Sequence, residues 1–291
     1  MAGFLEVLSP GPLATLQDLG RPGYAHVGVG PAGAADRGAH ALANRIVGNE
    51  TDQATIEVLL GGLALQMRGF AVLAVAGAPA PVTINGRAAD HHSPLYLADG
   101  DVIRLGTPPA GLRSYVAVAG GIAEPPVLGS RAWDSMARIG PEPLAPGKLL
   151  PIGEGRHHAP NLGVVPTLPP TLDPVMVALI PGPRDAWIAG GVRRLTDGHW
   201  TVSVQSDRVG VRLEGDPLTR ARGFADRELP SEGTVRGAIQ VPPSGLPVVF
   251  GADHPVTGGY PVVGVLREID SDRLAQARPG QQIVFTTRPT N

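Results

Sequence analysis

Cysteine is absent from this chain of 291 residues, and several other residue types are scarce. Without cysteine there is no disulfide framework, no thiol nucleophile and no thiolate ligand for a metal ion. Aromatic residues make up 4% of the chain, so the core must consist mostly of aliphatic side chains. Charged residues make up 17%, which is below the usual quarter, and Lys148 is the only lysine.

The charge pattern and the hydropathy pattern exclude two classes of partner. The net charge is −2 and the sequence contains no basic block or stripe, so nucleic acid is not expected to bind. No apolar run reaches the roughly 18 residues that a membrane-spanning helix needs. No signal peptide is visible at the start of the sequence. We therefore expect a soluble, cytoplasmic protein that does not contact a membrane.

Glycine and proline are abundant, with 40 and 31 residues, and they separate many short apolar runs. This pattern predicts a mainly β fold with a few short helices. Between residues 54 and 121, runs of about four to six residues alternate with turn signals such as Asn85-Gly86 and Asp99-Gly100. The clearest helix is predicted over 37–47, where Asp36 is the expected N-cap and apolar residues recur at helical spacing.

A proline-rich stretch near the middle of the chain predicts a division into domains. Residues 156–173 are rich in proline and are typical of a linker. We therefore expect an N-terminal subdomain over 1–155 and a C-terminal subdomain over 174–291, with the short strands forming an antiparallel barrel or sandwich.

Several standard sites are excluded by spacing. Gly28–Gly33 matches GxGxxG, but Pro31 interrupts it and Asp36 would place a negative charge where a phosphate would lie. No P-loop, GxSxG or HExxH motif is present. The pairs His91-His92 and His157-His158 are sequence neighbours, which cannot both face one metal ion on a regular strand. We expect no metal site.

The most informative stretch runs from Gly237 to Gly264. Two strand-like runs are joined by a turn, Pro242–Gly245, and are followed by a loop rich in polar residues, glycine and proline. In that loop Gly258 and Gly259 would let a ligand approach the main chain closely. The side chains that the loop would present are Asp253, His254, Thr257 and Tyr260. The alternative interpretation is the end of a structural hairpin with a tyrosine packed on it.

Other polar groups stand beside glycines elsewhere in the chain. They suit either a polar small molecule with carboxylate, amide or phosphate groups or a polar interface with another subunit. Two of them have a structural alternative: Arg131 can be a surface arginine, and the cluster of Gln17, Asp18 and Arg21 can hold a loop together by side-chain to backbone bonds. The candidates outside the 237–264 stretch are Gln17, Asp18, Arg21, Arg131 and Arg208, and Gln240 lies within it.

Five separated segments together resemble one known family. They are PGPLATLQDLGRPGY with VGPAGAADRGAHALANRIVGN, AGGI with LGSR, SDRVGVRLEG, GAIQVPPSGLPVV and DHPVTGGYP. Their residues and order are similar to those of the allophanate hydrolase subunit 2-like family, from about Phe4 to Thr286. That family includes one of the subunits of bacterial 5-oxoprolinase, the antagonist of the sporulation kinase inhibitor, and part of the carboxyltransferase domain of urea carboxylase.

The resemblance implies a fold, a reaction and partners. The implied fold is a pair of cyclophilin-like β-barrels. The implied partners are a subunit 1-like protein, itself cyclophilin-like, and in the oxoprolinase version a third subunit. Such a complex uses ATP to open the lactam of 5-oxoproline to glutamate, because phosphorylating an unreactive amide oxygen creates a leaving group. In urea carboxylase the equivalent domain carries a carboxyl group from biotin to urea.

The residues of the matching motifs then receive expected roles. Arg131, Arg208 and the Thr257-Gly258-Gly259 backbone are suited to hold phosphate or carboxylate. Asp253 is suited to act as a base or to orient water. We expect catalysis to involve Asp253, Arg208 and Tyr260. The expected binding residues are Gln17, Asp18, Arg21, Arg131, Gln240, His254, Thr257, Gly258 and Gly259.

One segment departs from the family pattern. After Gly129-Ser130-Arg131 the family usually has Ser-Thr and a glycine-rich run, whereas this chain has Ala132-Trp133 and few glycines. If that loop lines the active site, a substrate other than 5-oxoproline or urea is expected. Three hypotheses therefore stand: a subunit of an ATP-dependent amide or lactam hydrolase, a component of a biotin-dependent carboxyltransferase, or a regulatory module that binds its partner subunit.

Overall fold

The computed structural model describes residues 3–154 and 168–288. It divides into two compact units. The first consists of Met1–Arg21, Ala32–Asp134 and Arg138–Thr171, and the second of Pro22–Pro31, Ser135–Ala137 and Leu172–Asn291. Residues 156–167 of the predicted linker, which include the pair His157-His158, lie outside the described residues. The predicted domain boundaries therefore stay a prediction.

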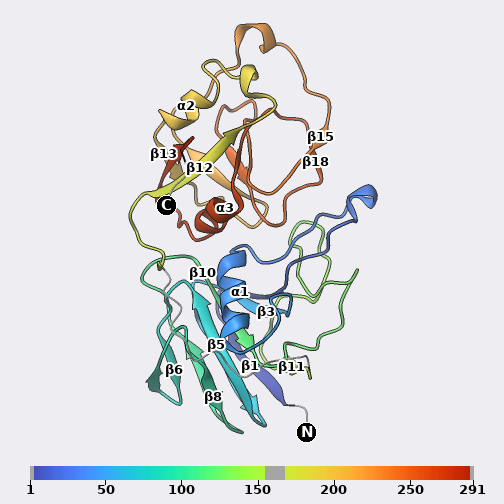
Figure 1. The fold of residues 1–291 in the computed structure, drawn as a ribbon, viewed down its shortest axis with the longest axis vertical. Coiled ribbons are helices and arrows are strands. Elements are labelled where there is room, and N and C mark those ends of the chain that lie inside the picture. The colour runs from blue at the N-terminus through green and yellow to red at the C-terminus, as the bar shows by residue number, and fades with distance from the viewer. Residues whose placement is uncertain (1–2, 155–167, 289–291) are drawn as a thin grey trace. The chain divides into compact units, whose positions relative to one another are not determined.

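The first unit contains two antiparallel sheets (Figure 1). Their apolar faces contribute to one core, in which Leu5, Leu65 and Ile103 from one sheet lie with Leu16 and Leu73 from the other. The six-stranded sheet has the order β11 (Leu149–Pro151), β1 (Phe4–Pro10), β4 (Leu63–Arg68), β9 (Val102–Leu105), β6 (Val82–Ile84), β7 (Arg87–Ala89). The five-stranded sheet has the order β2 (Leu13–Gln17), β3 (Thr55–Leu59), β10 (Arg113–Val118), β5 (Ala71–Gly77), β8 (Leu95–Leu97).

One helix, α1 (Arg37–Ile46), covers the outer face of the five-stranded sheet beside β5 and β10 (Figure 1). Asp36 is its N-cap, as predicted, because the Asp36 carboxylate accepts a hydrogen bond of 2.9 Å from the Ala39 N–H. Its apolar stripe packs on small side chains of the two strands, which let the helix lie close to the sheet. These are Ala74, Ala76 and Ala117. Strand β10 is consequently buried on both faces.

The second unit is built on a closed seven-stranded barrel. The ring is closed by a parallel pair, in which Val175 lies opposite Ile283. In barrel order the strands are β12 (Val175–Pro181), β19 (Val262–Leu266), β16 (Ala238–Gln240), β17 (Val248–Phe250), β14 (Gly210–Glu214), β13 (Trp200–Val202) and β20 (Gln282–Thr286). A two-stranded sheet pairs β15 (Glu232–Gly233) with β18 (Thr257–Gly258).

Short helices complete the second unit. Its barrel core contains Trp200, whose indole N–H is satisfied by the Leu195 carbonyl oxygen at 2.9 Å. The helices are η1 (Ala25–Val27), η2 (Asp185–Trp187), α2 (Val192–Thr196), η3 (Arg222–Phe224) and α3 (Glu268–Ala275). The prediction of a mainly β fold with few short helices is confirmed, and the hairpin predicted around Pro242–Gly245 is the antiparallel pair of β16 and β17.

A partly buried histidine is expected to make the first unit less stable in acid. Burial and, to a smaller extent, the neighbouring His92 lower the pKa of His91 to about 4. Because His91 favours its neutral form in the folded state, the stability associated with it is complete above pH 6.5 and is lost as the pH falls toward 4. One pKa unit corresponds to about 1.4 kcal/mol, and for a partly exposed ring we expect a loss of about 2 kcal/mol.

Hydrogen exchange of the amides in β5 and β8, measured between pH 7 and pH 4, checks this expectation. His91→Gln keeps a polar side chain but cannot titrate, so it should flatten the part of the pH dependence that comes from His91. An unchanged pH profile in that variant would assign the acid sensitivity to other groups.

Candidate functional site

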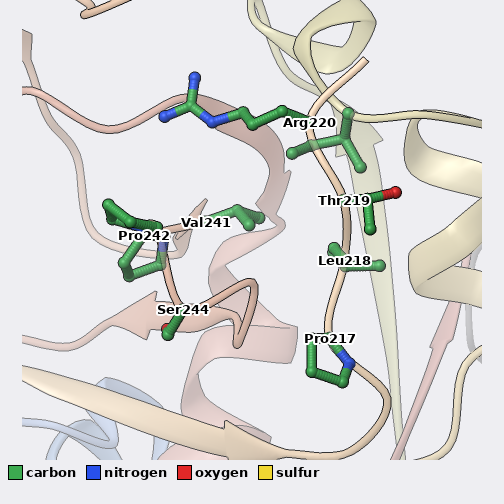
Figure 2. Close-up of a pocket in the computed structure, with 9 residues that line it drawn as sticks. Pro217, Leu218, Thr219, Arg220, Val241, Pro242 and Ser244 are labelled. Atoms are coloured by element: carbon green, nitrogen blue, oxygen red, sulfur yellow. The ribbon is translucent and has the colours of Figure 1, made fainter. Parts of the chain in front are cut away.

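The second unit contains a pocket with a volume of about 310 Å³ beside the turn between β16 and β17 (Figure 2). One wall is the extended segment Pro217–Arg220, and the other is Val241–Ser244. None of the residues predicted for the site lines this pocket, although Gln240 directly precedes the lining residue Val241 in the sequence.

In the first unit, the carboxylate of Asp18 joins two loops. One carboxylate oxygen accepts hydrogen bonds from the Gly20 N–H at 2.7 Å and from the Ser130 hydroxyl at 2.6 Å. The other accepts from the Arg131 N–H at 2.6 Å. Asp18 is buried, so these bonds are shielded from water. The structure thus brings the predicted segments around Asp18 and Arg131 together through main-chain contacts.

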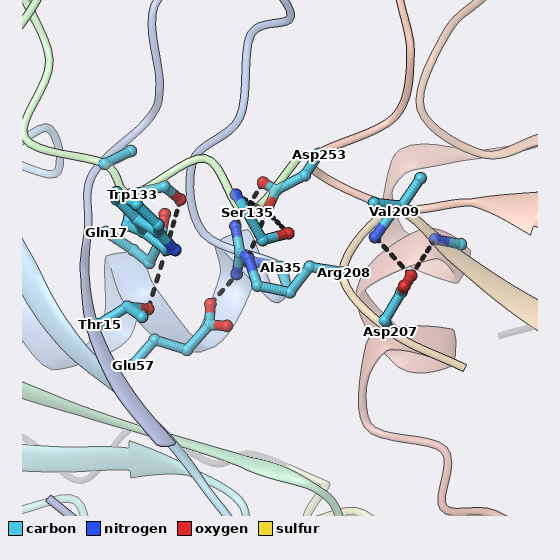
Figure 3. Close-up of polar contacts among 12 residues, drawn as sticks. Thr15, Gln17, Ala35, Glu57, Trp133, Ser135, Asp207, Arg208, Val209 and Asp253 are labelled. Atoms are coloured by element: carbon cyan, nitrogen blue, oxygen red, sulfur yellow. Dashed lines mark hydrogen bonds and ion pairs between the residues drawn. The ribbon is translucent and has the colours of Figure 1, made fainter. Parts of the chain in front are cut away.

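Gln17 and Arg21 belong to the same connection and are fully or almost fully buried. The Gln17 amide nitrogen donates to the Thr15 hydroxyl and to the Trp133 carbonyl oxygen, both at 3.0 Å (Figure 3). The Arg21 guanidinium donates to the carbonyl oxygens of Val127 and Ala132. These hydrogen bonds join loop segments, as one of the two alternatives for this cluster expects, and the binding role of Gln17, Asp18 and Arg21 stays a prediction.

Arg131 uses its guanidinium in the same way. Its Nε donates to the Glu124 carbonyl oxygen at 2.5 Å, and the side chain is half-buried. This hydrogen bond uses one of the three guanidinium nitrogens. The phosphate-binding role expected of Arg131 stays a prediction.

In the second unit, Arg208 and Asp253 form a buried ion pair (Figure 3). Two nitrogens of Arg208 donate to the two carboxylate oxygens of Asp253, each at 2.8 Å. The same carboxylate accepts from the Ser135 N–H at 2.9 Å and from the Ser135 hydroxyl at 2.7 Å. Three of these four hydrogen bonds are accepted by Oδ2 and one by Oδ1, so the carboxylate is held in place mainly through Oδ2.

The glycine-rich loop after β17 is organised around Gln240. The buried Gln240 side chain donates to the Tyr260 carbonyl oxygen at 3.2 Å. At Gly258, a Cβ would lie 2.5 Å from the Gln240 amide nitrogen. The close approach predicted for this glycine is therefore made by a side chain of the same unit. The Tyr260 side chain itself is 44% exposed.

The remaining predicted residues of this loop differ in exposure. His254 is buried, stacks on Phe250 with a ring-centre distance of 6.0 Å, and places Nδ1 2.8 Å from the Pro255 carbonyl oxygen. Thr257 is exposed and its main chain pairs with Gly233. Gly259 is half-buried. Thr257 and Tyr260 are thus the predicted side chains of this loop that solvent or a ligand can reach.

Two residues were not predicted from the sequence, although the structure shows one at the Asp253 carboxylate and the other at the pocket. Ser135 completes the hydrogen bonding of Asp253, and its only sequence signal was its place in the segment that departs from the family pattern. Arg220 lines the pocket, and the signal available for it was the run Arg220-Ala221-Arg222-Gly223-Phe224, in which two arginines precede an aromatic residue.

The acidic and histidine side chains do not gather into a metal centre in the part of the chain that the structure describes. Residues 3–154 and 168–288 contain no group of three or more His, Asp or Glu side chains placed to hold a metal ion. Over the same ranges, no helix has the length and apolar character needed to cross a membrane.

Comparison with known proteins identifies relatives along almost the whole chain. The family model described as carboxyltransferase domain, subdomain A and B, matches residues 27–287. A 5-oxoprolinase subunit of Escherichia coli (strain K12) is 35% identical over 285 residues, which cover 97% of this chain and 90% of that protein.

Solved structures agree with that result. The crystal structure of TTHA0988 superposes with a TM-score of 0.88 at 34% identity and covers 97% of this chain and 55% of that chain. The urea amidolyase of K. lactis superposes with a TM-score of 0.90 at 28% identity, with 97% of this chain and 18% of that chain covered. The chain therefore spans about half the length of TTHA0988 and less than a fifth of the urea amidolyase.

The resemblance seen in the sequence motifs is thus confirmed at the level of family. The relatives, a 5-oxoprolinase subunit and a urea amidolyase, are subunits or parts of enzymes, and their names do not fix a substrate for this chain. The extent and identity of the matches establish that this chain belongs to the family of carboxyltransferase domains, subdomains A and B.

Proposed function

We propose that this chain is one subunit of a heteromeric, cytoplasmic, ATP-dependent hydrolase that opens 5-oxoproline to glutamate. The observation that carries this proposal is the 35% identity to a 5-oxoprolinase subunit over 97% of this chain and 90% of that protein. Because many functions share one fold, we rest the proposal on sequence identity over the full match and not on the barrel. Its partners would be a subunit 1-like protein and a third subunit.

Both arginines that were expected to hold phosphate have partners within the chain. Arg208 is bound by Asp253 in a buried pair, and Nε of Arg131 donates to the Glu124 carbonyl oxygen. Breaking the Arg208–Asp253 pair to bind a triphosphate would leave a buried carboxylate without its cation. We therefore propose that ATP is bound by another subunit of the complex.

The exposed part of the loop after β17 is the best candidate for contact with the substrate. Tyr260 presents a phenolic hydroxyl from a half-exposed side chain, and Thr257 presents a hydroxyl nearby in the sequence. Asp253, which is buried and paired with Arg208, would position this loop through Arg208 and Ser135 instead of acting as the base. Tyr260 can donate or accept a hydrogen bond during ring opening.

The test is reconstitution of the complex. The chain would be purified with its subunit 1-like partner, the third subunit would be added, and glutamate release would be measured with ATP and 5-oxoproline. We expect activity only when all components are present. Tyr260→Phe removes one hydroxyl and should lower turnover by about a hundredfold. The matched control is Tyr96→Phe, which removes the hydroxyl of an exposed tyrosine in the first unit.

Three results would speak against this proposal. Turnover by the isolated chain equal to that of the complex would contradict a role as a dependent subunit. Equal turnover of Tyr260→Phe and Tyr96→Phe would remove Tyr260 from the site. A stable complex without turnover would favour the regulatory hypothesis, in which the chain binds its partner subunit without catalysis.

A second candidate function is carboxyl transfer from biotin. It is favoured by the description of the matching family model and by the TM-score of 0.90 to the urea amidolyase of K. lactis. This function requires a biotin carboxylase and a biotin carrier as partners. Transfer of labelled bicarbonate to an amide by the complex, with no glutamate release from 5-oxoproline, would select it.

A further inference from the structure

Main-chain hydrogen bonds hold the walls of the pocket beside the β16–β17 turn in place. The Leu218 N–H donates to the Gly245 carbonyl oxygen at 2.9 Å, and the Gly245 N–H donates to the Pro242 carbonyl oxygen at 2.9 Å. Gly245 has a φ of +76°, and a Cβ there would lie 2.5 Å from the Leu218 carbonyl oxygen. The two walls therefore meet at a position that only glycine can occupy without strain.

The segment Pro217–Arg220 is also held on its other side. The Ala189 N–H donates to the Thr219 carbonyl oxygen at 3.0 Å, and the Ala221 N–H donates to the Trp187 carbonyl oxygen at 2.9 Å. With hydrogen bonds on both sides, this wall keeps its position without a ligand. A preformed pocket loses little entropy when a ligand binds.

Arg220 brings a positive charge to this pocket. In Figure 2 its side chain extends from the Pro217–Arg220 wall across the space toward Val241 and Pro242. One terminal nitrogen, Nη1, is buried and has no hydrogen-bond partner among the residues that the structure describes. Because solvent does not reach Nη1, a ligand in the pocket would be bound by the other guanidinium nitrogens, Nε and Nη2.

Other arginines of the same unit are neutralised internally. Arg184 pairs with Glu232, and Arg236 pairs with Asp272 at 2.7 Å. Arg220 instead lies over the ring of Trp187, with its guanidinium carbon 5.2 Å from the ring centre. Such a contact orients the guanidinium plane and leaves its edge available for a planar anion.

The aromatic support below Arg220 is extended. Trp187 stacks on Phe224 with a ring-centre distance of 4.7 Å and an angle of 22° between the planes. Trp187 is buried, with 6% of its surface exposed, so it cannot easily turn away. Arg220 is therefore held by a rigid platform, and its position does not depend on a carboxylate of the protein.

The walls restrict the kind of anion that fits. Pro217, Leu218, Val241, Pro242 and Pro243 give the pocket hydrocarbon surface, while Thr219 and Ser244 add hydroxyl groups. Arg220 is the only charged residue among the described residues that line it. A single guanidinium matches one planar carboxylate, whereas a phosphate dianion would bring a second charge without a second cation among the described residues that line the pocket.

We propose that this pocket is a binding site for a small organic monocarboxylate with a compact apolar body, whose carboxylate is held by Arg220. The volume of about 310 Å³ lies at the lower end of the range of ligand sites, which fits a small molecule. This site is separate from the residues of the proposed function, and it needs neither ATP nor a partner subunit to bind its ligand.

The test uses the full chain and cyclopentanecarboxylate as the probe, titrated by isothermal calorimetry. We expect saturable binding with a Kd on the order of 1 mM for a ligand of this size. Cyclopentanecarboxamide has the same shape without the charge and should bind at least about tenfold more weakly. Inorganic phosphate, titrated separately, should not compete.

Variants assign the binding to this pocket. Arg220→Gln should weaken binding of cyclopentanecarboxylate at least about tenfold. Arg222→Gln removes an identical charge from an exposed arginine two residues away and should leave binding within about twofold, because salt screens an exposed charge. Arg220→Lys keeps the charge without the planar fork, so its affinity for cyclopentanecarboxylate should lie between those of Arg220→Gln and Arg222→Gln. Thermal unfolding of each variant checks that the fold is retained.

Clear results would overturn this proposal. They are no saturable binding to the wild-type chain, equal binding of the acid and the amide, or equal loss in Arg220→Gln and Arg222→Gln. Because the probe is not a lactam and no ATP is present, failure here leaves the hydrolase proposal untouched. Failure of the hydrolase assay likewise leaves this site standing.

Discussion

Replacing Arg208 with methionine is expected to destabilise the second unit by about 3–5 kcal/mol. The Arg208–Asp253 pair is buried, with side-chain exposures of 5% and 0%, and both carboxylate oxygens are used. Removing the cation would leave a buried negative charge, to which Ser135 still donates two hydrogen bonds but which no longer has a cation beside it. Urea unfolding, followed by hydrogen exchange of the amides in β14 and β17, measures the loss.

The matched control is an exposed ion pair in the same unit. Arg193 and Asp197 pair at 3.3 Å across one helical turn, with side-chain exposures of 85% and 57%. Arg193→Met should change stability by less than about 0.5 kcal/mol, because exposed pairs contribute little. Equal effects of the two substitutions would contradict the importance of burial. The double variant Arg208→Met with Asp253→Asn should cost less than the sum of its parts.

The stability of the buried pair limits what an Arg208 variant can reveal about catalysis. A loss of activity in such a variant cannot be separated from a loss of folding, although the residue type suggested a role in catalysis. Tyr260→Phe is the cleaner probe, because that side chain is half-exposed and the substitution keeps its ring.

Gly61→Ala is expected to destabilise the first unit by about 4 kcal/mol. Gly61 lies between β3 and β4 with a φ of +76°, and a Cβ there would be 2.0 Å from the Gly106 carbonyl oxygen and 2.7 Å from the Gly106 carbonyl carbon. Both contacts are with main chain, which cannot move aside as a flexible side chain would. Denaturant unfolding followed by hydrogen exchange in β3 and β4 measures this effect.

Gly86→Ala measures the cost of the left-handed backbone conformation alone, without a clash of the new Cβ. Gly86 has nearly the same φ, +78°, in the turn between β6 and β7, but no atom lies within 4 Å of its Cβ position. Alanine there should cost only about 1 kcal/mol, the strain of the left-handed conformation. A similar cost at both glycines would mean that the main chain around Gly106 adapts.

Local signals in the sequence were sufficient to predict the helix α1 and the hairpin of β16 and β17. Asp36 followed by an apolar stripe predicted α1, and the structure has this helix with the expected N-cap. The apolar runs on either side of Pro242–Gly245 predicted the hairpin of β16 and β17. These predictions succeed because capping, turn formation and amphipathic spacing depend on residues close together in the chain.

The strand β2 was not predicted, because Gln17 was interpreted together with Asp18 and Arg21 as part of a loop. Thr15 and Gln17 are buried in this strand, where the Gln17 amide nitrogen donates to the Thr15 hydroxyl and to the carbonyl oxygen of the distant Trp133. A polar side chain becomes acceptable in the interior only when such a partner is supplied by another part of the fold.

For the candidate site too, local sequence determined some properties and long-range packing determined others. The sequence by itself determined the family, the mainly β class and the residue types of the polar loops. Only the tertiary structure decided what those residues do: Arg208 meets Asp253, 45 positions away, through neighbouring barrel strands, while Arg220 is left facing a pocket. Whether a charge is paired or available depends on long-range packing, and residue type and local spacing carry no record of that packing.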